Sequence, residues 1–518
     1  MLVNEVKIGE VIQGSVLGGL EVKLALDNPE ELRIGYPVIV EGKTYDFYCL
    51  VEDIVNQQLD IAERLAGSQF RDAIVPGGAT HEGYGGPLFY SKALLRPIQL
   101  IEKESGDMSQ PQTIPPYFSE ARHAALQDVQ LIYEITETSA PLGTIRGVEP
   151  FYVHIDFATL TEKPFGIFGR TGSGKSILNK LICLSILAKD VGSVLVFDMQ
   201  GEYGVFSRAD KSAGLPYYFK DKVEVFSLDP KNREAKPFVI DPREIEPEDL
   251  LVALQDLSPS MVDTIYAIHR RRGDRDLIAA IHEATVEQLG EDLVHEMSLN
   301  ALKRRIERIK RLPFIREGKD AFSQIVQHVR QGKSIVLDFG EFGGDTSVYL
   351  FVANVLAHRL YDQWTEKGEQ RRLIVFLEEA HKFLDPAVAP YTKFAQLARE
   401  TRKFNLILAL VDQRPTRIDQ EVRSQLANRL VLSLKEQSDI QSALAGVQDV
   451  GMWEKIVGTI PVRTVAVIGD AIRVPTVIDI MTYDDANVHE HIVGRSRMTE
   501  ADLARVASKA DTIFGSGP

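Results

Sequence analysis

The rhythm of hydrophobic and polar positions changes about 140 residues into the chain. Before that point, short runs of β-branched and apolar residues stand between Gly, Asn and Pro, which is typical of strands joined by turns. The runs are Gly9–Val16, Leu20–Leu24, Pro37–Val40, Tyr45–Glu52 and Leu94–Ile101. Several short strands at close spacing predict a small β-barrel over residues 1–100. A polar, proline-containing stretch follows, so we expect residues 101–139 to be a linker.

From residue 140 onward, continuous apolar runs alternate with helical patterns. Such runs are expected when helices cover both faces of a parallel sheet. They are Phe165–Phe168, Val194–Phe197, Val223–Phe226, Ser334–Asp338, Leu373–Leu377, Leu406–Val411 and Leu430–Leu434. The predicted fold class is therefore α/β, with a parallel-sheet core over residues 140–242 and 331–480.

Residues 243–330 interrupt this alternation. They are rich in Glu, Leu, Arg and Ala at helical spacing and contain no convincing strand, so they predict a helical insertion in the core. Strands are expected again at Thr464–Ile468 and Ile472–Ile478. A polar C-terminal tail is expected over residues 481–518.

One segment matches the phosphate-binding loop pattern G-x-x-x-x-G-K-[ST] in full, namely Gly169-Arg-Thr-Gly-Ser-Gly-Lys175-Ser176. It follows an apolar strand and precedes a helical segment, as that pattern requires. The loop's N–H groups and the helix N-terminus favour phosphate, while the lysine reaches the β and γ phosphates and the serine hydroxyl ligates Mg²⁺. We therefore predict that ATP and Mg²⁺ are bound by Gly169, Thr171, Gly172, Ser173, Gly174, Lys175 and Ser176.

Two adjacent carboxylates, Glu378 and Glu379, end the apolar run Leu373–Leu377. A strand that ends in acids delivers them to the carboxyl edge of the sheet, where ligands bind in such folds. Glu378 is predicted to hold the water shell of Mg²⁺, and Glu379 to polarise the attacking water. The alternative is that one carboxylate only caps the next helix. His381 could sense the nucleotide or simply be a packed or solvent-facing histidine.

Polar residues also follow two other predicted strands. Glu202, in Asp198-Met-Gln-Gly-Glu202-Tyr203, could orient water or Mg²⁺, or only stabilise a loop. Gln413 follows the run Leu406–Val411 and is predicted to contact the γ phosphate or the lytic water as a sensor. A plain turn is the alternative for Gln413.

Several arginines are candidates for contacts beyond the chain's own nucleotide. Arg399, Arg402 and Arg414 could act on the site of a neighbouring subunit, although each could equally be a surface ion-pair residue. Two basic runs in the predicted insertion could contact DNA or a partner, or could be a solvated helix face. The DNA candidates in these runs are Arg270, Arg271, Arg304 and Arg305.

Composition narrows the class of protein without choosing its substrate. Of 518 residues, 44% are hydrophobic and 26% charged, which excludes a disordered or fibrous chain. The net charge of −15 argues against a simple DNA-coating protein, but an acidic exterior can enclose a basic channel. The two cysteines exclude a disulfide framework, and no apolar run approaches the ~20 residues that span a bilayer. We therefore expect a cytoplasmic protein with no membrane segment.

The order of these motifs resembles the HerA family of FtsK/HerA-superfamily ATPases. The resemblance is carried by the phosphate-binding loop, Asp198-x-x-Gly-Glu-Tyr203, Glu378-Glu379-Ala-His381 and Gln413-Arg-Pro, in that order. It implies a RecA-like core and a homo-hexameric ring that translocates double-stranded DNA. It also implies that the N-terminal barrel docks a partner nuclease (NurA-like), or another effector, in DNA end processing or repair.

Three departures from the family pattern and two alternative functions accompany this resemblance, and one departure is the overall acidity of the chain. Asp412 stands where the family usually has Ser or Thr. Lys163 stands where the family commonly has an Arg that could act on a neighbouring subunit, and Lys lacks the bidentate fork of Arg. One alternative is a conjugation- or secretion-type ATPase. The other is an ATP-assembled ring that scaffolds an effector in phage defence.

Overall fold

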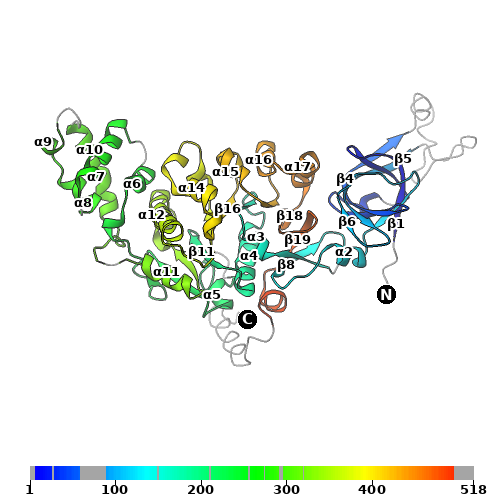
Figure 1. Ribbon diagram of the computed structural model, residues 1–518, viewed down its shortest axis with the longest axis horizontal. Helices are drawn as coiled ribbons and strands as arrows, with labels where there is room; N and C mark the ends of the chain where they lie inside the picture. The colour runs from blue at the N-terminus through cyan, green and yellow to red at the C-terminus, as the bar shows by residue number, and fades with distance from the viewer. Residues whose placement is uncertain are drawn as a thin grey trace, which may run out of the picture. The chain divides into compact units, whose positions relative to one another are not determined.

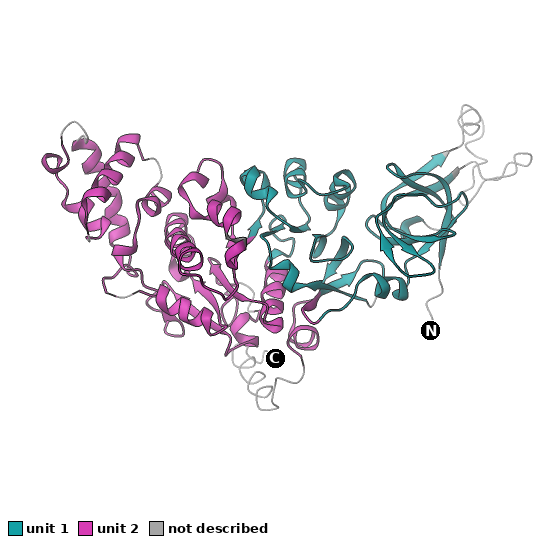
Figure 2. Cartoon of the chain, viewed as in Figure 1, with its two compact units in different colours: residues 1–136, 142–175, 410–480 teal, residues 137–141, 176–409, 481–518 magenta. Residues whose placement is uncertain are grey.

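The computed structural model describes most of the chain, in two compact units. The described residues are 6–25, 29–58, 89–148, 151–208, 212–254, 257–273, 275–290, 296–318 and 320–494. Unit 1 comprises residues 1–136, 142–175 and 410–480, and unit 2 comprises residues 137–141, 176–409 and 481–518 (Figure 2). The part of the expected C-terminal tail beyond residue 494 lies outside the described residues.

The N-terminal part of unit 1 is a closed antiparallel sheet. Among the described residues its strand order is β2-β1-β7-β3-β4-β5-β6, and an additional pairing between β2 and β5 closes it into a barrel (Figure 1). The strands are β1 (Lys7–Ser15), β2 (Gly19–Leu24), β3 (Pro37–Glu41), β4 (Tyr45–Gln58), β5 (Phe89–Glu102), β6 (Met108–Ser109) and β7 (Glu120–His123). Buried side chains such as Val22, Val38 and Leu95 fill its interior.

The rest of unit 1 carries a second set of strands, in the order β10-β17-β18-β19-β8-β9. β10 pairs with β17 in parallel, and β17, β18, β19 and β8 follow one another antiparallel. These strands are β8 (Ser139–Ile145), β9 (Tyr152–Asp156), β10 (Phe165–Phe168), β17 (Asn428–Leu432), β18 (Thr464–Gly469) and β19 (Thr476–Ile480). The helices are α2 (Leu126–Ile132), α3 (Phe157–Leu160), α15 (Gln420–Ser424), α16 (Gln437–Ala443) and α17 (Val450–Thr459).

Unit 2 contains parallel strands in the order β13-β12-β14-β11-β15. These are β11 (Ser193–Asp198), β12 (Val223–Ser227), β13 (Lys236–Pro237), β14 (Ser334–Asp338) and β15 (Leu373–Glu378). Strands β8 (Ser139–Ile145) and β16 (Leu406–Asp412) each begin in unit 2 and end in unit 1. Nearly every residue of β11, β14 and β15 is buried, as expected for strands covered on both faces. The predicted α/β fold class is confirmed.

Helices make up the remainder of unit 2. They are α4 (Lys175–Lys189), α5 (Leu215–Tyr218), α6 (Pro247–Ala253), α7 (Pro259–Arg271), α8 (Leu277–Glu283), α9 (Val286–Leu289), α10 (Glu296–Lys310), α11 (Phe322–Arg330), α12 (Thr346–Thr365), α13 (His381–Leu384), α14 (Lys393–Glu400) and α18 (Asp485–Val488). Helices α7, α8 and α10 pack on one another through apolar faces that include Ile265, Ile281 and Leu302. Each of the amphipathic helices α7 and α10 thereby leaves its charged face exposed.

Two sequence-based expectations differ from the observed elements. Strand β7 lies inside the expected linker 101–139, yet it pairs with β1 and β3 of the barrel. Its Arg122 is buried because it forms ion pairs with Glu41 and Asp128, each at 2.7 Å. The strand expected over Ile472–Ile478 begins only at Thr476, because Pro475 cannot donate a backbone hydrogen bond.

Candidate functional site

The loop between β10 and α4 has the backbone shape of a phosphate-binding loop. Gly172 and Gly174 have φ values of +75° and +108°, which L side chains rarely adopt. A Cβ atom on Gly172 would meet no atom within 4 Å, so the backbone of this residue is open to a ligand. The loop is anchored from both flanks, since Gly169 N donates to Asp412 O at 3.1 Å and Arg463 N donates to Ser173 O at 2.9 Å.

Two of the predicted ligand-contacting side chains meet beside this loop. The Thr171 hydroxyl donates to Gln413 Oε1 at 2.6 Å, which joins the loop to the end of β16. Lys175 Nζ bends back and donates to Gly169 O at 2.5 Å. Next to them is a cavity of about 340 Å³ that is lined by Arg170, Thr171, Gln413, Arg414, Leu434, Lys435, Glu436 and Asp439. The loop and the predicted sensor therefore lie side by side in unit 1.

Two buried polar atoms of the loop have no partner. Arg170 Nε and Ser173 Oγ form no hydrogen bond within the described part of the chain. Leaving such groups unpaired costs free energy unless a ligand or water satisfies them. The N–H of Arg170 and the hydroxyl of Ser173 are donors, as an anionic ligand requires. These residues therefore fit a bound phosphate group.

Glu378, in unit 2, lies in a largely desolvated setting at the end of β15. Its Oε1 accepts a hydrogen bond from the Tyr203 hydroxyl at 2.6 Å, and its carbonyl oxygen accepts one from the Tyr349 hydroxyl at 2.7 Å. Burial raises the pKa of the Glu378 carboxyl to about 8, although the Tyr203 hydrogen bond works in the opposite direction. The nearby negative charge of Glu202 raises this pKa further. A cation bound beside this carboxyl would stabilise its charged form.

The turn after β11 is built by a single carboxylate. Asp198 Oδ1 accepts from Glu202 N at 2.8 Å, and Asp198 Oδ2 accepts from Tyr203 N at 3.0 Å. Burial raises the pKa of Asp198, and these two backbone hydrogen bonds partly offset the effect. Tyr203 also accepts a hydrogen bond from Asn179 Nδ2 of α4 at 3.3 Å. Sequence reasoning quoted Tyr203 only as part of a motif and gave it no role.

Glu379 has a strained backbone. Its φ is +51°, in the left-handed region that non-glycine residues rarely occupy. Strain of this kind is concentrated at functional sites, where it orients a side chain. His381 Nδ1 lies 3.8 Å from Glu379 Oε2, so the histidine is placed next to the predicted catalytic carboxylate.

The other predicted residues are more scattered. Lys163 Nζ pairs with Asp470 Oδ2 at 2.7 Å, and Arg399 Nε donates to Ala395 O of its own helix at 3.1 Å. Arg414 is exposed, and its backbone N donates to Asp412 Oδ1 at 2.6 Å. The side chain of Arg402 lies outside the described residues.

The predicted DNA contacts divide into exposed and structural arginines. Arg270 on α7 and Arg304 on α10 are exposed, whereas Arg305 is half-buried. Arg271 Nη1 donates to the carbonyl oxygens of Gln288 and Leu289 at 3.0 and 2.9 Å. Arg271 therefore already has a structural role, because it satisfies carbonyl groups at the end of α9.

The described ranges of the chain contain no cluster of three or more His, Cys, Asp or Glu side chains that could hold a metal ion. A Mg²⁺ ion at Ser176 and Glu378 would need oxygen ligands from phosphate and water, which is usual for this ion. No helix in these ranges is both long and apolar enough to cross a membrane.

Comparisons with known proteins find a family model that matches the central part of the chain. A family model described as "Helicase HerA, central domain" matches residues 140–360. The chain is 25% identical over 421 residues to the DNA double-strand break repair helicase HerA of Sulfurisphaera tokodaii, which covers 75% of this chain and 78% of the relative. It is 24% identical to the Sulfolobus acidocaldarius HerA, and this match covers 91% of this chain and 93% of the relative. The expected resemblance to the HerA family is confirmed.

One solved structure shows a likeness at lower identity. VirB4 of Thermoanaerobacter pseudethanolicus is 14% identical with a TM-score of 0.49, and the match covers 68% of this chain and 98% of that one.

Proposed function

We propose, on the premise that this chain is a distant relative of the HerA helicases, that it is an ATP-hydrolysing DNA translocase. The observation that carries the proposal lies in unit 2. There Glu378 is joined through Tyr203 to Asn179, which stands on the helix that follows the phosphate-binding loop. An acid at a strand end beside that helix is the arrangement that P-loop enzymes use for Mg-ATP.

Binding is assigned to the loop and to the first residues of α4. The loop N–H groups hold the phosphates, and Lys175 exchanges its hydrogen bond with Gly169 O for contacts with the β and γ phosphates. Ser176 and Glu378 would hold Mg²⁺, which neutralises charge on the phosphate oxygens when it is bound. The left-handed glycines at 172 and 174 keep the loop backbone available for these contacts.

Hydrolysis is assigned to Glu379 and Gln413. Glu379, fixed by its left-handed backbone, accepts a proton from the attacking water. Gln413 reports the γ phosphate, because its Oε1 already accepts from Thr171 of the loop and shifts when a phosphate enters. Of the cations that could act on a neighbouring subunit, Arg414 is favoured because it is exposed beside Gln413.

The resemblance extends the proposal to assembly and partners. It favours a homo-hexamer on double-stranded DNA, with a partner nuclease (NurA-like) or another effector on the N-terminal barrel. Just before strand β7 of the barrel, the side chains of Tyr117 and Phe118 are 70% and 72% exposed. They form an apolar surface suited to protein contact. A native mass of six chains and copurification with that nuclease are the measurements that check these two points.

The experiment that tests the nucleotide site separates binding from hydrolysis. Glu379→Gln should retain the affinity for ATP and lower the hydrolysis rate at least about 100-fold, because the carboxylate is lost without a change of shape. Lys175→Ala should lose measurable ATP binding. Unchanged hydrolysis in both variants would contradict the assignment.

A further inference from the structure

Tyr203 connects the helix α4, which follows the phosphate-binding loop, to the acidic end of β15. We propose that Tyr203 is a positioning residue that, together with Asn179, fixes the Glu378 carboxylate for metal binding. The inference rests on the proposed function, because it takes Glu378 as a holder of Mg²⁺.

The contacts form a continuous chain. The Tyr203 hydroxyl donates to Glu378 Oε1 at 2.6 Å, and its oxygen accepts from Asn179 Nδ2 at 3.3 Å. Both Tyr203 and Asn179 are buried, at 0% and 1% exposure, so water does not compete for these hydrogen bonds. Asn179 stands three residues after Ser176, so both side chains lie on the same face of α4.

Tyr203 itself is held from two directions. Its backbone N donates to Asp198 Oδ2 at 3.0 Å, and its carbonyl oxygen accepts from Leu215 N at 3.2 Å. The side chain therefore cannot follow Glu378 if the carboxylate rotates. Because the hydroxyl occupies Oε1, the carboxylate keeps one orientation and offers Oε2 to the metal or to its water.

A phenol is suited to this task, since it is a rigid side chain with one polar atom at its tip. A carboxylate that is free to rotate would have to be ordered when the metal binds, and the entropy cost would weaken binding. Tyr203 removes this cost before the ligand arrives. Its effect should therefore appear in the dependence on Mg²⁺ and should be absent from nucleotide binding without the metal.

The test compares Tyr203→Phe with the intact chain. The affinity for a non-hydrolysable ATP analogue is measured by calorimetry with and without Mg²⁺. We expect the affinity without Mg²⁺ to be unchanged and the gain given by Mg²⁺ to fall about tenfold, the effect of one lost hydrogen bond to a charged group. The Mg²⁺ concentration for half-maximal hydrolysis should rise in parallel.

A matched control loses the same kind of contact elsewhere in unit 2. The Tyr218 hydroxyl donates to Asp485 Oδ1 at 2.8 Å, so Tyr218→Phe also removes one tyrosine–carboxylate hydrogen bond. It should leave the Mg²⁺ response unchanged. Asn179→Ala removes the donor to Tyr203 and should shift the Mg²⁺ response in the same direction as Tyr203→Phe. It also serves as the test if Tyr203→Phe fails to fold.

The outcomes distinguish the positioning role of Tyr203 from the metal-binding role of Glu378. If Glu378→Gln loses the gain from Mg²⁺ while Tyr203→Phe and Asn179→Ala keep it, the positioning role is wrong and the proposed function stands. If Glu378→Gln also keeps the full gain, the assignment of Glu378 fails and the positioning role fails with it. A reduced gain in Tyr203→Phe and Glu378→Gln, but not in Tyr218→Phe, supports the inference.

Discussion

At the scale of single residues, backbone strain and side-chain chemistry meet at Glu379. A left-handed φ costs a non-glycine residue about 1–2 kcal/mol, and the fold retains this cost at the residue that is predicted to be catalytic. Glycine would relieve the strain but would remove the carboxylate. Stability and activity should therefore change in opposite directions at this position.

The corresponding prediction compares two variants of Glu379. Glu379→Gly should melt at a higher temperature than Glu379→Gln, by an amount that corresponds to about 1 kcal/mol, and both should be inactive. Thermal unfolding and ATPase assays measure the two properties. Asp449, with a φ of +52° on an exposed turn, provides the control. Asp449→Gly should gain stability without losing activity, and a loss of stability in Glu379→Gly would contradict the argument from strain.

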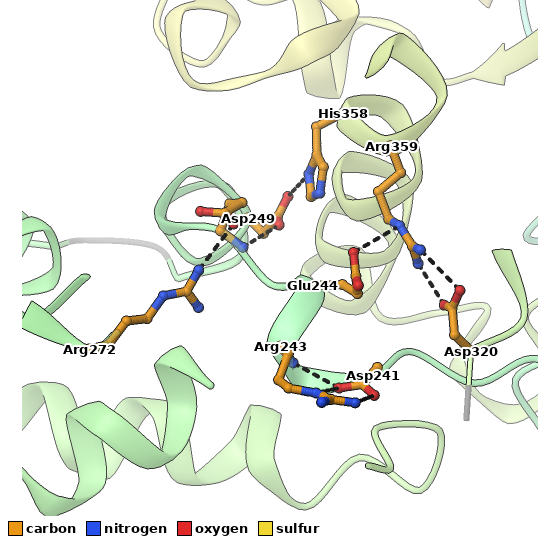
Figure 3. A network of polar contacts seen from close by, with 9 residues as sticks. Asp241, Arg243, Glu244, Asp249, Arg272, Asp320, His358 and Arg359 are labelled. Carbon is orange, nitrogen blue, oxygen red and sulfur yellow. Dashed lines mark hydrogen bonds and ion pairs between the residues drawn. The ribbon is translucent and has the colours of Figure 1, made fainter. Parts of the chain in front are cut away.

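At the scale of elements, charged residues in and beside the predicted helical insertion, residues 243–330, contact α12 (Figure 3). Arg359 of α12 donates to both oxygens of Asp320 at 2.6 and 3.0 Å, and its Nε lies 3.3 Å from Glu244 Oε2. Asp249 of α6 accepts from Asn354 at 2.9 Å and contacts His358 Nδ1 at 3.3 Å. Since Asp249 is fully buried, a positive charge on His358 would stabilise the pair.

The His358–Asp249 pair predicts a pH dependence of stability. Burial alone would lower the pKa of His358, but the charge and hydrogen bond of Asp249 outweigh it, so the pKa is raised. A raised pKa stabilises the folded chain fully below about pH 6.5, and the stabilisation is lost as pH rises through the folded-state value. Apparent melting temperatures measured from pH 6 to pH 9 should therefore show a decline that His358→Gln reduces.

His328 provides the control of opposite sign. Burial, together with the charge of Lys236, lowers its pKa, so its contribution is present above about pH 6.5 and is lost on acidification. His328→Gln should therefore flatten the acid side of the stability profile. If His328→Gln reduced the decline of the melting temperature at alkaline pH as much as His358→Gln does, the role given to His358 would be contradicted.

The exposed faces of α7 and α10 lead to a prediction about DNA. Replacing Arg270 and Arg304 together by Glu should raise the half-saturating concentration of duplex DNA at least about tenfold, because phosphate contacts are lost. The salt dependence of binding should become shallower by about one unit of slope for each lost contact. Lys231→Glu with Arg275→Glu makes the same charge change at other exposed positions, and equal weakening there would contradict a specific contact.

The elements also show what the sequence could and could not predict. Apolar runs predicted the central strands because burial on both faces leaves a continuous signal, and the glycine spacing indicated the loop between β10 and α4 with its left-handed glycines. Strand β7 was missed because its buried Arg122 is satisfied by ion pairs that the local sequence does not reveal. The contact of Tyr203 with Glu378 joins residues 175 positions apart and depends on the fold.

At the scale of the whole molecule, acidity and DNA binding are compatible only if basic groups are concentrated. The chain carries a net charge of −15, yet Arg270 and Arg304 are exposed on neighbouring helices of the helical region. A ring of six such chains would repeat these cations around a common axis, which strengthens the local field on DNA. A single chain should therefore bind DNA weakly compared with the assembled ring.

The proposed function couples ATP hydrolysis to DNA. The most direct measurement is the ATPase rate of the purified protein with and without linear duplex DNA, beside Glu379→Gln. We predict that DNA raises the rate several-fold and that the variant is inactive under both conditions. Clear basal hydrolysis with no response to DNA would contradict a DNA translocase and would favour the ATP-assembled scaffold for an effector.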